Sequence, residues 1–107
     1  MHSFDGFSLN PPYLYVVMEL CKRGSLTDVL QTNELSYLWR LQMAHDVMCA
    51  MAHMHQLGFV HRDMKSLNCF VTDVGDELAV RLGDFGETVT TTAAAKEEPR
   101  QVGTMQW

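Results

Sequence analysis

The sequence predicts an α+β fold from three patterns: an apolar run at residues 13–20, helical spacing at 36–57 and two strand-like stretches between 69 and 82. Residues 13–20 are aromatic or branched almost throughout, which indicates a buried strand. The turn-forming residues 10–12 mark its start. The spacing over 36–57 is that of an amphipathic helix. Helices and strands in separate stretches of one short chain are typical of the α+β class.

Two helices are expected. Ser25 can cap a short helix that includes Val29, with Asp28 in its first turn. The longer helix covers 36–57 and stops at Gly58, a residue common just beyond helix ends. Its apolar residues recur every three or four positions: Leu38, Leu41, Ala44, Val47, Met48, Met51 and Met54.

The elements after the long helix are shorter. Residues 69–71 and 78–82 predict two strands joined by a turn at 72–76. From Glu87 onward the pattern fades into sequence rich in threonine and alanine, which predicts a mobile loop. The 107 residues show no internal repeat and no interior boundary, so we expect a single domain.

Composition narrows the class of protein. The chain has 8 basic and 13 acidic residues and a net charge of -5, which disfavours binding to nucleic acid or to anionic lipid. No apolar stretch approaches the roughly 18 residues that a membrane span needs. The three cysteines lie far apart without a CxxC pair, which disfavours a disulfide framework or a zinc site. These features predict a protein of the reducing cytoplasm.

Two short motifs carry the chemistry. Residues 61–68 read HRDMKSLN, and residues 84–86, which begin 21 positions after Asp63, read DFG. A lone HRD is usually a solvated charge cluster, and a lone DFG is usually a turn. Together, in this order and between a helix and paired strands, they resemble the catalytic loop and the metal-binding motif of the eukaryotic protein kinases. The resemblance implies a partial protein-kinase-like fold, mostly its C-lobe.

The resemblance also implies a role for each polar residue of the motifs. Asp63 would orient the substrate hydroxyl and accept its proton, and Lys65 would offset charge on the transferring phosphate. A lysine here makes the loop similar to that of Ser/Thr kinases. Asn68 and Asp84 would bind Mg²⁺, which prefers oxygen ligands and substrate phosphates. The implied cofactors are therefore ATP and Mg²⁺, and the implied partner is a protein substrate.

Residues 15–21 resemble the strand and hinge that receive adenine in kinases, with Met18 guarding the back of the pocket. The resemblance implies that backbone groups of Glu19 and Cys21 bond the adenine edge. It also implies that Ser25 lies near the ribose and that Phe70 forms the floor under the ring. Composition alone leaves open that this run is simply a core strand.

The end of the chain extends the resemblance. Residues 103–107 read GTMQW and are similar to the GTxxW stretch of Ser/Thr kinases in the tyrosine-kinase-like group. In that group the stretch lies in the activation segment, so Thr104 would hydrogen-bond near Asp63 and Lys65 and help to seat the substrate. Phe85 would pack against the histidine of the catalytic loop.

A phosphate in the activation segment is a further implication. Arg62 would pair with it and order the segment through charge-assisted hydrogen bonds. Threonines are ordinary loop residues, so no single one is favoured as the acceptor. The candidates are Thr88, Thr90, Thr91 and Thr92.

Several parts of a kinase domain are missing from these residues. The seven glycines form no GxGxxG loop, and none of the three lysines lies in a strand ahead of the hinge. We therefore expect the isolated chain to be inactive and to need the remainder of the domain for a stable fold. The alternative is a truncated kinase that acts as a non-catalytic interaction module. The expected parts are strand and hinge (1–24), C-lobe helices (25–60), catalytic loop to DFG (61–86) and activation segment (87–107).

Overall fold

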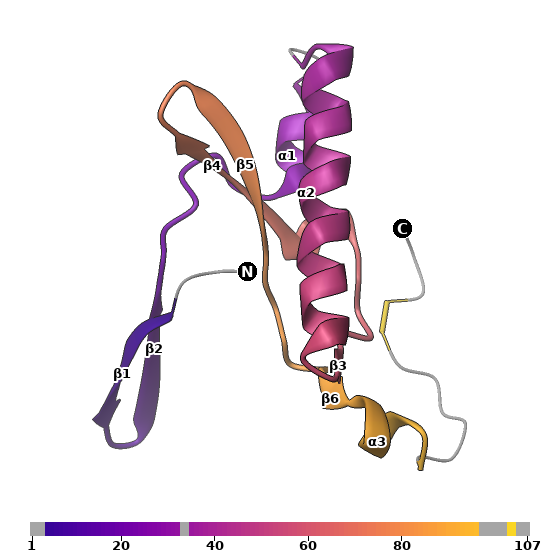
Figure 1. Cartoon of the computed structure of the whole chain (residues 1–107). Coiled ribbons are helices and arrows are strands. Elements are labelled where there is room, and N and C mark those ends of the chain that lie inside the picture. Colours follow the sequence, from indigo (N-terminus) through magenta and orange to yellow (C-terminus); the bar gives the residue numbers. More distant parts are fainter. Residues whose placement is uncertain (1–3, 33–34, 97–102, 105–107) are drawn as a thin grey trace.

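The computed structural model describes residues 4–32, 35–96 and 103–104, and in these ranges helices and strands occur in separate stretches (Figure 1). This mixed content confirms the predicted α+β class. The elements run in the order β1 (Phe4–Asn10), β2 (Tyr13–Met18), α1 (Leu26–Gln31), α2 (Tyr37–Gln56), β3 (Phe59–Val60), the 3-10 turn η1 (Ser66–Asn68), β4 (Cys69–Val74), β5 (Glu77–Leu82), β6 (Val89–Thr90) and α3 (Thr91–Ala94).

The two predicted helices are confirmed, and side-chain caps explain where they begin. The N–H of Asp28 donates to the Ser25 hydroxyl at 3.2 Å, and the Ser25 N–H donates to the Asp28 carboxylate at 2.9 Å, which closes a capping box before α1. At the start of α2 the Ser36 hydroxyl accepts the N–H of Trp39 at 3.3 Å, without a reciprocal bond. Gly58 follows the last turn of α2 with a φ of +79°. In the described ranges, no helix is both apolar enough and long enough to cross a membrane.

The predicted hairpin at the centre of the chain is also confirmed. β4 and β5 pair antiparallel from Cys69 opposite Leu82 to Val74 opposite Glu77. Figure 1 shows β5 running beside the long helix α2. The core lies between these elements, and its buried apolar residues are Val29, Met43, Met54, Cys69, Val71, Val80 and Leu82. The segment 61–68, which carries the HRD motif, follows α2 and β3 and leads into β4.

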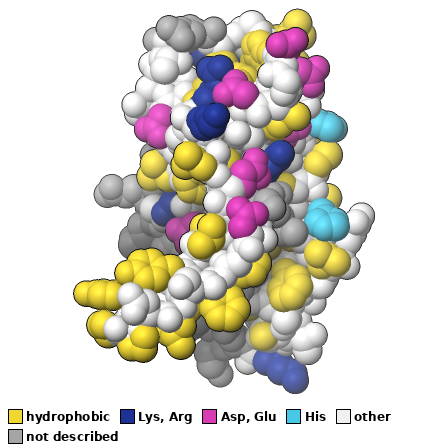
Figure 2. Space-filling view, turned by 90° about the vertical axis from the view of Figure 1, so that its left-hand side faces the viewer, with side chains coloured by type: hydrophobic (Ala, Val, Ile, Leu, Met, Phe, Trp, Pro, Cys, Tyr) yellow, Lys and Arg dark blue, Asp and Glu magenta, His cyan; other side chains and the backbone are white. Residues whose placement is uncertain are grey.

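The burial predicted for the first strand is wrong. β2 forms as expected, but its six residues are all exposed, from 50% for Val17 to 64% for Leu14. It pairs with β1, a strand that the sequence patterns did not reveal, and the hairpin projects away from α2 (Figure 1). Figure 2 shows hydrophobic side chains gathered over this projecting part. An apolar run therefore predicted the strand, whereas its burial depends on a surface that no described residue supplies.

The prediction of a mobile loop after Glu87 is wrong for residues 89–94. β6 pairs antiparallel with β3, which places Val60 opposite Val89. The N–H of Thr91 then donates to the carbonyl of Gly58 at 2.8 Å, and α3 follows directly. Residues 89–91 are held by backbone hydrogen bonds to residues 58–60, which follow α2. Backbone hydrogen bonds require no hydrophobic pattern, so the sequence does not reveal them. Residues 97–102 and 105–107 of the expected loop lie outside the described residues.

Candidate active site

The segment after β3 folds back on itself and brings the ends of its motif together. The turn η1 forms when the Asn68 N–H donates to the Lys65 carbonyl at 2.9 Å. The Asn68 side chain, which is buried, then donates through Nδ2 to the Asp63 carbonyl at 2.9 Å and to the Asp63 carboxylate at 3.1 Å. The spacing of five residues thus lets one loop present a carboxylate and a carboxamide side by side.

Thr104 reaches the same carboxylate from the far end of the chain. Its hydroxyl donates to Asp63 Oδ1 at 2.8 Å, and it accepts a hydrogen bond from Lys65 Nζ. Lys65 Nζ also lies 3.3 Å from Asp63 Oδ2, and both of these side chains are mostly buried. The structure therefore joins the four residues that the sequence named as catalytic. Their catalytic roles remain predictions.

This arrangement favours the charged form of Asp63. The hydrogen bond from Thr104 is the largest cause that holds the pKa of Asp63 below its ordinary value of 3.8, and Lys65 and Asn68 act in the same direction. Partial removal from water opposes these contacts. At neutral pH Asp63 is therefore an anionic hydrogen-bond acceptor, the state needed to orient a hydroxyl group.

His61 links the loop to the DFG motif. Its ring is almost fully buried and donates through Nε2 to the carbonyl of Gly83 at 2.8 Å, while Nδ1 accepts the N–H of Asp63 at 3.2 Å. These two bonds require the neutral form with the proton on Nε2. The ring centroids of His61 and Phe85 lie 5.4 Å apart, so the contact expected between these side chains is present.

The expected Mg²⁺ ligands, Asn68 and Asp84, lie on two segments that a backbone hydrogen bond joins. The N–H of Gly83 donates to the carbonyl of Asn68 at 2.9 Å, which brings the backbone before Asp84 against the catalytic loop. Asp84 is exposed and has a φ of +54°, a conformation that aspartate tolerates better than most residues. Among the described residues, no three His, Cys, Asp or Glu side chains are grouped to hold a metal. A carboxylate and a carboxamide with phosphate oxygens is instead the donor set that suits magnesium.

The expected adenine-binding residues lie where the linker 19–24 meets the β4–β5 hairpin. Phe70 on β4 forms a bridge with Ser25, and the hydroxyl of Ser25 donates to Asp28 at 2.6 Å within the cap of α1. Met18 at the end of β2 is exposed, and Glu19 is half-buried. Burial is the main cause that raises the pKa of the Cys21 thiol. The structure brings Ser25 and Phe70 together, and the nucleotide-binding roles of all five residues remain predictions.

Arg62 contacts Glu87, the residue directly after the DFG motif. Its Nε donates to the carbonyl of Glu87 at 2.7 Å, and its Nη2 lies 3.9 Å from the carboxylate of Glu87. Glu87 was not among the predicted site residues, although an acidic residue directly after DFG is a visible signal in the sequence. The candidate phosphate acceptors differ in exposure: Thr90, Thr91 and Thr92 are exposed, whereas the Thr88 hydroxyl is buried with no hydrogen-bond partner in the described chain.

Gly103 is a second residue that the reasoning did not single out. A Cβ atom at this position would lie 2.7 Å from the Arg62 carbonyl oxygen, and the φ of Gly103 is +91°. The absence of a side chain is therefore what allows residues 103–104 to approach the catalytic loop. The only sequence signal was its position directly before Thr104.

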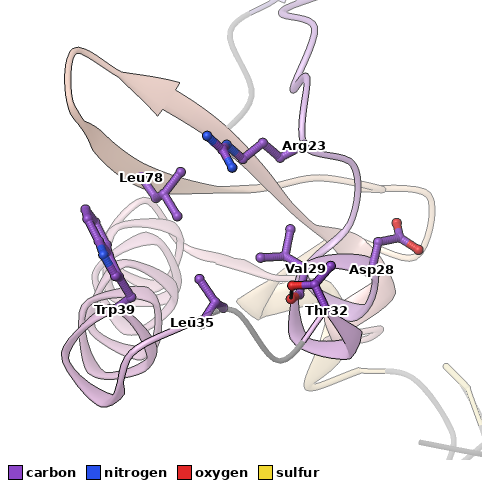
Figure 3. Close-up of a pocket in the computed structure, with 7 residues that line it drawn as sticks. All are labelled: Arg23, Asp28, Val29, Thr32, Leu35, Trp39 and Leu78. Atoms are coloured by element: carbon purple, nitrogen blue, oxygen red, sulfur yellow. Dashed lines mark hydrogen bonds between the residues drawn. The ribbon is translucent and has the colours of Figure 1, made fainter.

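A cavity of about 400 Å³ lies apart from the cluster around Asp63 (Figure 3). It is bordered by α1, the start of α2 and β5, and its lining residues are Arg23, Asp28, Val29, Thr32, Leu35, Trp39 and Leu78. None of them belongs to the cluster around Asp63. The cluster of Asp63, Lys65, Asn68 and Thr104 therefore lies outside this cavity.

The long helix, the loop that follows it and the hairpin that ends before Asp84 define the chain as part of a protein kinase fold. Residues 2–107 match the family of protein tyrosine and serine/threonine kinases. The chain belongs to this family, as its two motifs indicated.

Curated relatives agree with this assignment. A probable LIM domain-containing serine/threonine-protein kinase of Dictyostelium discoideum is 40% identical over 97 residues, which cover 89% of this chain and 14% of the relative. Serine/threonine-protein kinase 1 of Arabidopsis thaliana is 34% identical over 89% of this chain and 11% of its own length. Human mitogen-activated protein kinase kinase kinase kinase 3 is 32% identical over 98% of this chain and 12% of its own length. The chain thus spans about a tenth of each relative.

Proposed function

We propose that these residues form the middle part of a protein kinase that transfers the γ-phosphate of ATP to a serine or threonine hydroxyl of a protein. The observation that carries the proposal is the cluster in which Asp63 is bonded by Thr104, Lys65 and Asn68. A protein carboxylate held charged beside a lysine and a hydroxyl suits the positioning of an alcohol for phosphoryl transfer.

Each member of the cluster has a distinct part in this proposal. Asp63 accepts the hydrogen bond of the substrate hydroxyl. It takes the hydroxyl proton as the oxygen bonds to the γ-phosphorus and the bond from that phosphorus to the departing ADP breaks. Lys65 places a positive charge within 3.3 Å of that carboxylate, close to where the transferred phosphate gains negative charge. Thr104 keeps the side chains of Asp63 and Lys65 next to each other, since its hydroxyl forms a hydrogen bond with each of them.

Asn68 and Asp84 are the residues that would hold Mg²⁺. The ion would neutralise charge on the phosphate oxygens. Nδ2 of Asn68 is occupied by Asp63, so its carboxamide oxygen is the atom available to a cation. The nucleotide itself would lie against the linker 19–24, with Phe70 beneath the adenine and Met18 at the back.

The isolated chain is inactive in this proposal. Its three lysines are Lys22 in the linker, Lys65 in the catalytic loop and Lys96 after α3, so none lies in a strand ahead of the linker to bind phosphates. The complete domain would supply that group. A cytoplasmic location belongs to the same proposal, supported by three cysteines that form no disulfide among the described residues.

The test is the substitution Asp63→Asn in the complete kinase domain that contains these residues. Removal of the proton acceptor should lower kcat by roughly 10²- to 10⁴-fold while the Kd for ATP stays unchanged. The matched control is Asp76→Asn, in an exposed turn residue between β4 and β5, which should leave both constants unchanged. Phosphate transfer to a protein substrate and nucleotide binding are measured separately.

Two outcomes contradict the proposal. Undiminished turnover in Asp63→Asn would show that the base lies elsewhere. A wild-type domain that binds ATP and transfers no phosphate would favour the non-catalytic interaction module instead.

A further inference from the structure

In the described residues, the linker 19–24 connects the β1–β2 hairpin to the rest of the chain. The end of the linker next to α1, at residues 23–24, is fixed by backbone hydrogen bonds. The N–H of Arg23 donates to the Val71 carbonyl at 3.1 Å, and the N–H of Val71 donates to the Gly24 carbonyl at 2.9 Å. Figure 1 shows the hairpin projecting from this linker without packing against α2. The orientation of the hairpin therefore depends on what holds the other end of the linker, at Glu19 next to β2.

That near end is held by a side-chain ion pair. Arg81 on β5 donates through Nε to Glu19 Oε2 at 3.3 Å, and each side chain is 29% exposed. A second pair, between Arg23 and Asp73, is shorter at 2.7 Å but has side chains that are 51% and 44% exposed. The pair of Glu19 with Arg81 is the less exposed of the two, and it is the one that holds the end of the linker next to the hairpin.

The position of Arg81 connects this restraint to the expected adenine floor. Arg81 stands directly opposite Phe70 in the β4–β5 register. The charges of the same pair act on the Cys21 thiol. Burial is the main cause that raises the pKa of Cys21, the negative charge of Glu19 raises it further, and the positive charge of Arg81 lowers it. One guanidinium group therefore lies next to both the linker and the strand that carries Phe70.

We propose that Arg81 is a positioning residue for nucleotide binding, because its ion pair with Glu19 sets the linker at a fixed separation from Phe70. The inference rests on the proposed function, since it assumes that adenine enters between the linker and Phe70. Arg81 does not contact Asp63, Lys65 or the expected magnesium ligands in the described contacts. Its effect is therefore on nucleotide affinity and not on the transfer step.

The kinetic test compares variants of the complete kinase domain. Arg81→Ala should raise the KM for ATP about threefold and leave kcat unchanged, the factor expected for one partly buried ion pair. Arg81→Lys keeps the positive charge, so its KM for ATP should lie between the values of wild type and Arg81→Ala. The exchange Glu19→Arg with Arg81→Glu should return the KM toward the wild-type value. Asp73→Asn, which breaks the exposed pair, is the matched control and should leave the KM unchanged.

A second measurement does not depend on activity. Amide hydrogen exchange over residues 19–22 should be faster in Arg81→Ala than in wild type, and the charge exchange should restore its protection. In Asp73→Asn the rates should stay those of wild type, because backbone bonds hold that end of the linker. The comparison is made without nucleotide.

The outcomes separate the two proposals. An unchanged or lowered KM in Arg81→Ala overturns the positioning role, and so does unchanged exchange over the linker. A wild-type domain without phosphate transfer overturns the proposed function, while hydrogen exchange still decides whether Arg81 holds the linker. Loss of kcat in Arg81→Ala with an unchanged KM also overturns the inference, because it would place Arg81 in the transfer step.

Discussion

The substitution Gly103→Ala should detach Thr104 from the catalytic loop. The added Cβ would lie 2.7 Å from the Arg62 carbonyl oxygen, whereas ordinary contacts begin at 3.4 Å, so one of the two must move by about 0.7 Å. The φ of +91° adds strain of about 1 to 2 kcal/mol for a residue with a side chain. A shift of this size would stretch the 2.8 Å bond from Thr104 to Asp63 to the limit of a hydrogen bond.

The pKa of Asp63 should change when the hydrogen bond from Thr104 is lost. The bond from Thr104 is the largest cause that lowers it, so Gly103→Ala should raise the pKa of Asp63 toward 3.8. The bonds of the charged carboxylate stabilise the fold above pH 3.8, and this contribution is lost as the pH falls through the lowered pKa of the folded state. In Gly103→Ala this contribution should be smaller, and its loss should be complete at a higher pH than in wild type.

The assay is an NMR titration of the aspartate carboxyl carbons in the complete domain. Gly75→Ala is the matched control, because Gly75 also has a positive φ, +61°, but a Cβ there would meet no atom within 4 Å. It should leave the pKa of Asp63 unchanged. Thr104→Val removes the hydroxyl without backbone strain and should raise the pKa as Gly103→Ala does. If both variants titrate like wild type, the assigned contact between Thr104 and Asp63 is refuted.

Two further predictions concern stability. Ser25→Ala removes the cap of α1 and should lower the free energy of unfolding of the complete domain by about 1 kcal/mol in chemical denaturation, whereas an unchanged midpoint would contradict the capping box. The isolated 107 residues should melt without cooperativity or aggregate in calorimetry and light scattering, because β2 and apolar residues of α2 such as Leu38 and Met48 are exposed. A single sharp transition with ordinary solubility would contradict that expectation.

Local hydrogen bonding explains which elements were predictable. Ser25 and Asp28 are three residues apart and cap α1 by themselves, and Gly75 supplies the turn that joins β4 to β5. The same holds for the spacing from Asp63 to Asn68, since a single turn of chain brings these two side chains together. Such contacts need no distant partner, so short patterns in the sequence were enough to predict them.

The contacts that complete the site join residues far apart in the chain. Thr104 meets Asp63 across 41 residues, and Arg81 meets Glu19 across 62. The resemblance to kinases predicted the first of these contacts. Nothing in residue type or spacing predicted the second, since Arg81 and Glu19 are ordinary charged residues until β5 and the linker are placed side by side.

The sequence by itself determined the family, both larger helices and the hairpin of β4 and β5. It also named the four residues that meet around Asp63, whose catalytic roles stay predictions. The tertiary structure alone decided that β2 is exposed and that residues 89–90 pair with β3 before α3 begins. It also decided that Glu87 meets Arg62 and that Arg81 meets Glu19. The reason is that local patterns record the hydrogen bonds and periodicity within one segment. Burial and long-range contacts depend on which surfaces the folded backbone brings together, and this information is spread over the whole chain.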